Sequence, residues 1–177
     1  MPATIQLRRL TGANSSITST NITTGSAHAG AEDTNTSPCT IPVPTSGSNY
    51  SYWLITQLNA TVGADNALNN IKFYSDGGNG FGTGITAIVG AASGYTQATG
   101  TAGSSGLFLN VANYPTLSSN GASDLFAYTS ACKLAVGGSL AGGTTGSFGF
   151  RVVTQLSVIS TAGAGNSSEE TQTFQYD

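Results

Sequence analysis

The nine residues 76–84, DGGNGFGTG, have the composition of a ligand-binding loop. Their glycines would let main-chain amides approach an anion, while Asp76 and Asn79 offer oxygens that would hold a calcium ion weakly. A GxxxxGK[ST] phosphate loop, however, needs a lysine after Gly82, where a threonine stands, and the calcium nonapeptide GGxGxDxUx needs an aspartate in place of Gly82. We therefore expect a glycine hinge, with Phe81 as a candidate contact with a neighbouring molecule.

Catalysis would require titratable groups held close together. His28 is the only histidine and lies in a polar stretch without a rigid framework, and no GxSxG motif surrounds a serine. The carboxylates lie in or beside expected turns, where they cap amides or are solvated; they are Glu32, Asp33, Asp65, Asp76, Asp124, Glu169, Glu170 and Asp177. We expect no enzyme, and neither a catalytic, a cofactor-binding nor a metal-binding residue.

Two single cysteines, Cys39 and Cys132, lie far apart and have neither CxxC spacing nor a histidine nearby. Two buried free thiols are expected in a cytosolic product, and a disulfide is the alternative.

The composition excludes several partners. Charged residues make up 7% of the 177 residues, and a net charge of −3 with five basic side chains cannot supply the phosphate contacts of a nucleic-acid interface. No apolar run is long enough to span a membrane, and the first residues lack the apolar core of a signal peptide, so we expect a product made in the cytoplasm. A surface of so little charge resists self-association poorly and suits an assembly.

The pattern of apolar residues predicts strands and almost no helix. Residues 147–160 read as a half-buried strand with Arg151, Gln155 and Ser157 on its polar face, and 49–62 as a strand covered on both faces. Shorter strands are expected at 3–10, 69–75, 84–90, 106–112, 132–138 and 170–177. Together they predict an all-β, single-domain antiparallel β-sandwich over residues 1–177, jelly-roll-like in topology.

At most one short helix is expected, within residues 122–135, where Ser123 or Asp124 would be the N-cap.

The polar segment 14–48 is too long for an ordinary loop in a compact domain. Its prolines Pro38, Pro42 and Pro44 hold the backbone extended, which makes them candidate contact residues. We expect either an arm that pairs with a neighbouring subunit or a mobile surface loop.

Three short motifs resemble a group of tailed-bacteriophage virion proteins. They are the opening ATIQLRRLTGAN, the internal NNIKFYSDG and the terminal ETQTFQYD, 29 residues in all, and the resemblance extends over about a third of the chain. The resemblance implies a β-sandwich or jelly-roll structural protein of the particle and carries over no catalytic or ligand-binding residue. The expected function is capsid decoration or cementing in the virion, as an oligomer such as a trimer bound to the major capsid protein.

The competing hypothesis is an extracellular filament subunit, an adhesin or a carbohydrate-binding sandwich. Such a module would stack sugars on aromatic side chains, for which Trp53, Tyr95 and Tyr114 are the candidates. A buried Trp53 would remove the best platform from this hypothesis.

Overall fold

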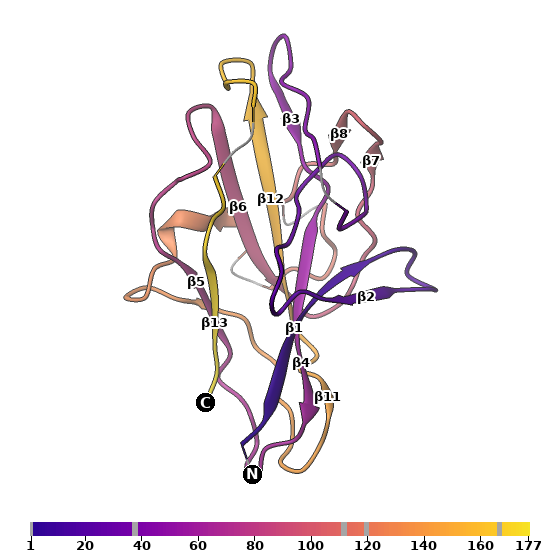
Figure 1. Cartoon of the computed structure of the whole chain (residues 1–177), viewed down its shortest axis with the longest axis vertical. Coiled ribbons are helices and arrows are strands. Elements are labelled where there is room, and N and C mark those ends of the chain that lie inside the picture. Colours follow the sequence, from indigo (N-terminus) through magenta and orange to yellow (C-terminus); the bar gives the residue numbers. More distant parts are fainter. Residues whose placement is uncertain (1, 37–38, 111–112, 119–120, 166–167) are drawn as a thin grey trace.

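The computed structural model describes residues 2–36, 39–110, 113–118, 121–165 and 168–177. Over these residues the chain folds into antiparallel sheets that pack face to face, with one 3₁₀ turn, η1, at Leu125–Ala127 (Figure 1). The predicted all-β, antiparallel sandwich class is therefore confirmed.

The larger sheet contains the long strands of the molecule. Its order is β2-β1-β4-β12-β6-β9, and β11 also pairs with β4 while β3 pairs with β12. These strands are β1 (Thr4–Thr11), β2 (Thr18–Asn21), β3 (Ser48–Tyr50), β4 (Leu54–Val62), β6 (Ile85–Ala92), β9 (Ser123–Asp124), β11 (Gly146–Ser147) and β12 (Arg151–Ile159). Strand β12 pairs with β6 over its first eight residues and with β4 on its other side, which places it centrally.

The second layer is a small sheet in the order β10-β5-β13. Its strands are β5 (Lys72–Ser75), β10 (Leu134–Ala135) and β13 (Gln172–Gln175). Phe73 of this sheet is fully buried against the larger sheet, in a cluster that includes Leu58, Val89 and Val152. A separate two-stranded ribbon is made by β7 (Gly100–Thr101) and β8 (Ser105–Gly106).

The other face of the larger sheet is covered by loops. Trp53 and Ile55 are buried there together with Leu109, Tyr114 and Val153. The prediction that β4 is covered on both faces is confirmed. The predicted half-buried character of residues 147–160 is wrong, because Gln155 on the expected polar face is only 1% exposed.

Both long predicted strands are interrupted. A break between β11 and β12 coincides with Gly149, which has φ +85°, a conformation that glycine adopts without a Cβ penalty. Residues 51–53 separate β3 from β4. The strand expected at 106–112 is wrong over its described part, where only Gly106 belongs to a strand. The expected helix is reduced to η1, whose N-cap is Asp124.

Much of the polar segment 14–48 packs against the rest of the same chain. Residues Thr18–Asn21 form edge strand β2, and beyond it Ile22 and Ala31 are buried. The Ala31 amide donates to Thr40 O (3.0 Å), and the Tyr52 amide donates to Gly30 O (2.7 Å). Removing this segment would therefore remove part of the core, and a freely extended arm is limited to its exposed parts.

Candidate functional site

The glycine loop 76–84 is folded by its own side chains. Asp76 Oδ1 accepts from the Gly78 amide (2.9 Å), and Asn79 Oδ1 accepts from the Phe81 amide (3.1 Å). The Asn79 side chain also donates to Ile85 O (2.8 Å), which fastens the loop to the start of β6. These are Asx turns, so one oxygen of each expected calcium ligand is used by the main chain.

Phe81, predicted as an exposed anchor, is half-buried. Its ring meets that of Phe126 edge to face, with centroids 6.2 Å apart, at the margin of the core. Of the proline contact candidates, Pro42 is exposed and Pro44 half-buried, whereas Pro38 lies outside the described residues.

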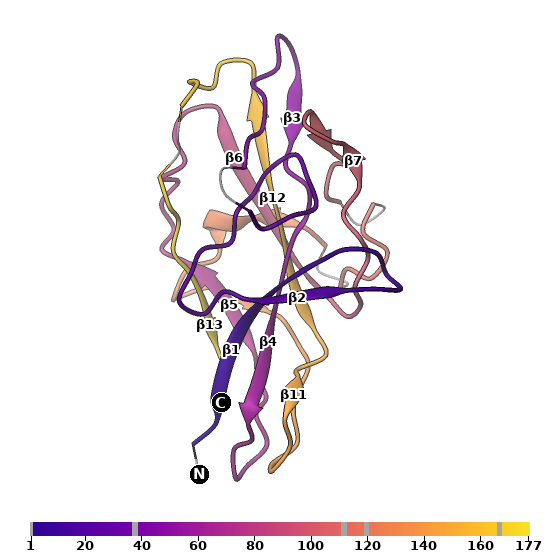
Figure 2. The same cartoon turned by 45° about the vertical axis from the view of Figure 1, so that its right-hand side comes forward.

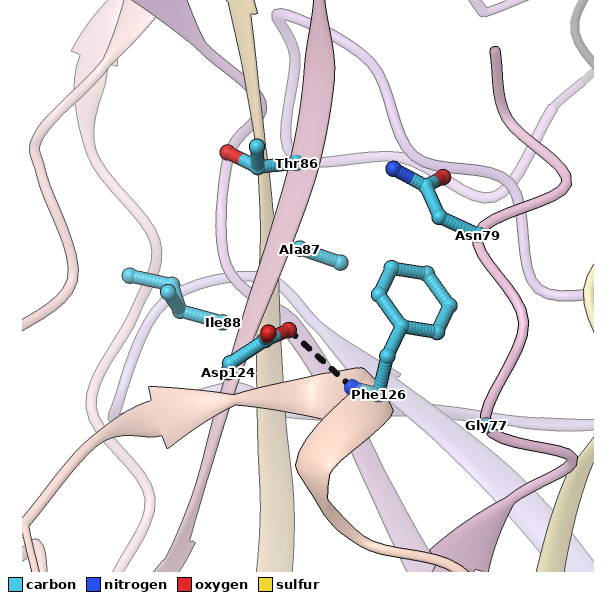
Figure 3. A pocket seen from close by; sticks show the side chains of 7 residues that line it. All are labelled: Gly77, Asn79, Thr86, Ala87, Ile88, Asp124 and Phe126. Atoms are coloured by element: carbon cyan, nitrogen blue, oxygen red, sulfur yellow. Dashed lines mark hydrogen bonds between the residues drawn. The ribbon is translucent and has the colours of Figure 1, made fainter. Parts of the chain in front are cut away.

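A hollow of about 430 Å³ lies between the glycine loop, β6 and η1 (Figure 3). The Phe126 ring projects between Asn79 and Ala87, and Asp124 Oδ1 accepts from the Phe126 amide (3.1 Å). Asp124 is the one titratable side chain among the lining residues, so its carboxylate acts as a helix cap without an acid–base partner in the hollow. This arrangement has the volume for a small ligand but no catalytic pair.

The remaining expectations about chemistry concern scattered side chains. The backbone amide of His28 donates to Asn35 Oδ1 (3.1 Å) within the polar segment. Among the described residues, no three His, Cys, Asp or Glu side chains lie together as a metal would need, and no helix is long and apolar enough to cross a membrane. Cys39 and Cys132 are free thiols, but the expected burial is wrong for both, because Cys39 is half-buried and Cys132 is exposed.

Two titratable groups with displaced pKa values, Arg9 and Tyr95, lie beside the turn that joins β1 to β2. Arg9 is 1% exposed, and its Nη1 donates to Leu10 O (3.0 Å) and Trp53 O (3.1 Å). Burial lowers the pKa of Arg9 to about 10, opposed by the charge of Asp33, so it stays cationic at neutral pH. Tyr95 donates its hydroxyl to Gly12 O (2.6 Å), and burial, aided by Asp33, raises its pKa. The cluster ties the hairpin to the sheet.

This cluster predicts a loss of stability in alkali. Tyr95 and Tyr114 have raised pKa values in the folded protein, so above pH 10, the ordinary tyrosine value, the unfolded chain binds fewer protons and stability falls as pH rises. The lowered pKa values of Arg9 and Arg151 act in the opposite direction over the same range and offset part of this fall. We expect the free energy of unfolding, measured in urea from pH 8 to 11, to decline, and to decline less steeply in Tyr95→Phe. Equal slopes would contradict the role of this hydroxyl.

The aromatic residues proposed as a sugar platform are mostly buried. Trp53 is 2% exposed and Tyr114 is fully buried, with their rings 4.8 Å apart edge to face. Tyr95 is half-buried and engaged with Gly12. The carbohydrate hypothesis therefore loses its best platform for stacking a sugar, because it depended on an exposed Trp53.

Two of the exposed large apolar side chains, Leu107 and Phe108, are adjacent in the chain and follow directly on β8, which the sequence pattern did not indicate. Leu107 is 51% and Phe108 40% exposed, whereas the next residue, Leu109, is fully buried. The Phe108 ring lies 4.9 Å from that of Tyr50 in β3. We call Tyr50, Leu107 and Phe108 the apolar patch. The sequence pattern pointed the other way, because residues 106–112 read as a strand in which Leu107 falls on the apolar face.

The patch is held by a buried amide beneath it. Gln155 Nε2 donates to Leu107 O (2.6 Å) and to Ser51 O (2.6 Å), and Gln155 Oε1 accepts from the Leu109 amide. The Asn113 side chain donates to Phe108 O. Main-chain bonds on both sides of Phe108 thus fix residues 107–109, and the two apolar side chains stay turned toward solvent.

No protein-family model matches the chain, and neither the search of curated proteins nor that of solved structures finds a match.

Proposed function

We propose that this chain is a structural protein of a virus particle, of the decoration or cement type, which binds the capsid surface through loop and strand contacts. The observation that carries the proposal is the apolar patch, in which Leu107 and Phe108 are held outward by main-chain hydrogen bonds. Large apolar side chains gathered at the surface mark interaction sites more often than scattered ones do.

Rigidity of the patch favours binding. Leu107 and Phe108 already have fixed backbones, so docking would order only their side chains, at about 0.5 to 1.5 kcal/mol each. Phe108 and Tyr50 together offer an aromatic surface of the kind that dominates interface energies. Residues 34–64 and 77–123 contain no Asp, Glu, Lys or Arg, so the patch belongs to segments that contribute no charge. Such a surface suits contacts that do not depend on salt.

The sequence supports the same function independently. The three motifs at 3–14, 69–77 and 170–177 resemble tailed-bacteriophage virion proteins, and the scarcity of charge suits a protein packed among neighbours. The partner in this proposal is the major capsid protein, with oligomers of the chain on the particle, and its location is the virion after synthesis in the host cytoplasm.

Cosedimentation tests the proposal. Purified protein is mixed with emptied capsids of the virus that encodes it, at ionic strengths of about 0.1 and 1 M, where charge interactions are weakly and strongly screened. We expect saturable binding that survives the higher salt. Binding lost at high salt would contradict an apolar contact, and filaments formed by the chain alone would favour the filament-subunit alternative instead.

Removal of the patch should abolish this binding. We expect the double variant Leu107→Ser/Phe108→Ser to weaken capsid binding at least about tenfold, since two exposed apolar side chains contribute on the order of 1 to 2 kcal/mol each at an interface. Both side chains are exposed, so the urea unfolding midpoint should change little. The matched control is Val62→Ser, which replaces a 40% exposed apolar residue at the end of β4. Unchanged capsid binding by the double variant would refute the assignment of the patch.

A further inference from the structure

The hairpin of β1 and β2 extends sideways from the sandwich (Figure 2). Strand β2, Thr18–Asn21, is the last strand of the larger sheet, and all four of its residues are exposed. The hairpin turn is braced, because the Gly12 amide donates to Asp33 Oδ2 (2.9 Å) and the Gln97 amide donates to Asn14 Oδ1 (2.7 Å). The sheet edge formed by β2 is therefore held in place before any partner arrives.

The ladder shows which main-chain groups of β2 point outward. The Ile22 amide donates to Leu7 O (2.9 Å), and Arg9 is the register partner of Thr20. Because hydrogen-bonded pairs alternate along an antiparallel ladder, Thr18, Thr20 and Ile22 direct their amides and carbonyls toward β1. Ser19 and Asn21 direct theirs away from the sheet.

This edge lacks the usual protection. Sheet edges in monomers are commonly guarded by charged side chains, prolines or bulges. Strand β2 reads TSTN, its register with β1 is regular, and residues 10–31 contain no Asp, Glu, Lys or Arg. Arg8 on β1 makes one long hydrogen bond from Nη1 to Ser19 O (3.4 Å). That weak contact is the only cover recorded for the outward groups among the described residues.

We infer that β2 pairs with β2 of a second copy of this chain, antiparallel about a two-fold axis at Thr20. Such an axis places Ser19 of one copy opposite Asn21 of the other. Both residues have outward amides and carbonyls, so the two pairs form four hydrogen bonds and the sheets join into one. In this register the outward amides and carbonyls of Ser19 and Asn21 all find hydrogen-bond partners on β2 of the second copy.

The paired strands carry no charged side chain of their own. The Cα atoms of the two Arg8 residues are separated by three strand spacings, about 14 Å in total. Each Arg8 guanidinium reaches Ser19 O at the edge by one 3.4 Å hydrogen bond, which it gives up when that carbonyl accepts from Asn21 of the other copy, while its Nη2 stays bonded to Gln6 Oε1. The apolar side chain of Ile17, 43% exposed beside β2, comes opposite Thr23 of the other copy and gains cover. The strands that meet are therefore uncharged, and Arg8 is the cation that has to turn aside.

The pairing of two β2 strands is weak in solution, and the fraction of paired chains rises with protein concentration. Four main-chain hydrogen bonds contribute about 1 kcal/mol each, which is of the order of the lowest estimates for the entropy lost on association. Copies held side by side on a surface would pair far more fully, because their effective concentration is high. The inference concerns the purified chain and stands whether or not it binds a capsid.

Disulfide trapping at the axis tests the register. Opposed residues of a non-hydrogen-bonded pair have Cα atoms about 4.5 Å apart, within the range a disulfide bridges. In a Cys132→Ser background, which removes the exposed native thiol, we expect Thr20→Cys to form covalent dimers under mild oxidation. Thr18→Cys, on the same strand and also exposed, is the matched control, because in this register Thr18 opposes Ile22 of the other copy. Equal dimer yields from both variants would overturn the two-fold register.

Proline at position 19 tests whether main-chain bonds hold the pair. The Ser19 amide points away from β1, so Ser19→Pro leaves the hairpin ladder intact while removing two of the four intermolecular hydrogen bonds. Added to the Thr20→Cys variant, it should reduce the dimer yield about tenfold or more, whereas Ser19→Ala, which keeps the amide, should not. Circular dichroism confirms that each variant is folded. A folded Ser19→Pro variant that still forms dimers at the same yield would refute the inference.

Discussion

Replacing Gln155 with leucine should lower the free energy of unfolding by about 3 kcal/mol, a large part of the 5 to 15 kcal/mol that typically holds a domain together. Gln155 is 1% exposed in the central strand β12. Its amide serves Ser51 O, Leu107 O and the Leu109 amide at once. Leucine has a similar size but no polar atoms, so the buried main-chain groups of Ser51 and Leu109 would each lose a partner, at about 1 to 3 kcal/mol per group.

Urea unfolding measures the loss, and hydrogen exchange locates it. We expect the Leu109 amide to exchange faster in Gln155→Leu than in the unchanged protein. The exchange rates of the β6 amides should change only as much as the global free energy of unfolding does. The matched control is Gln57→Leu in the adjacent strand β4. Gln57 is also buried, but its amide makes a single 3.4 Å hydrogen bond to Phe150 O, so its replacement should cost less than about 1 kcal/mol. Similar losses in both variants would show that Gln155 is not specifically required.

Gln155 also shows where sequence reasoning stops. The alternation of residues 147–160 correctly predicted a strand, because a period of two is a local property of the chain. The same alternation placed Gln155 on a solvent face, and this was wrong. Only the fold reveals that residues 107–109, nearly fifty positions away, cover that face and need an amide to satisfy them. A buried polar residue with distant partners leaves no local signal.

The candidate patch was missed for a related reason. In the strand predicted at 106–112, Leu107 and Leu109 share one apolar face, and such a strand would turn both side chains to the same side. In the structure no ladder continues through residues 107–109, so their orientation follows from Gln155 and Asn113 rather than from a pleat. Conversely, the conformational role of the glycine loop was predictable, because the missing lysine and aspartate are visible in the sequence itself.

The substitution Gly106→Ala should cost about 2 to 3 kcal/mol and disturb the patch, although it adds only one methyl group. A Cβ at Gly106 would lie 2.8 Å from the carbonyl carbon of Ser51 and 3.0 Å from Tyr52 Cα, and nearer still to Ser51 O. Ser51 cannot yield, because its amide donates to Leu156 O (2.9 Å) and its hydroxyl accepts from the Leu156 amide (3.0 Å). The strain therefore falls on the segment that begins at Gly106. The control is Gly163→Ala, where a Cβ meets nothing within 4 Å and stability should be unchanged.

Combining Gly106→Ala with Gln155→Leu distinguishes strain on this segment from general damage. If the added methyl moves residues 106–109 away from Ser51, it breaks the hydrogen bonds of Gln155 that leucine also removes. The losses in unfolding free energy should then overlap, so that the double variant is more stable than the sum of the single changes predicts by about 1 kcal/mol or more. Strict additivity would mean that Gly106 and Gln155 act separately. In that case Gln155, without a contribution from Gly106, would hold Leu107 and Phe108 outward.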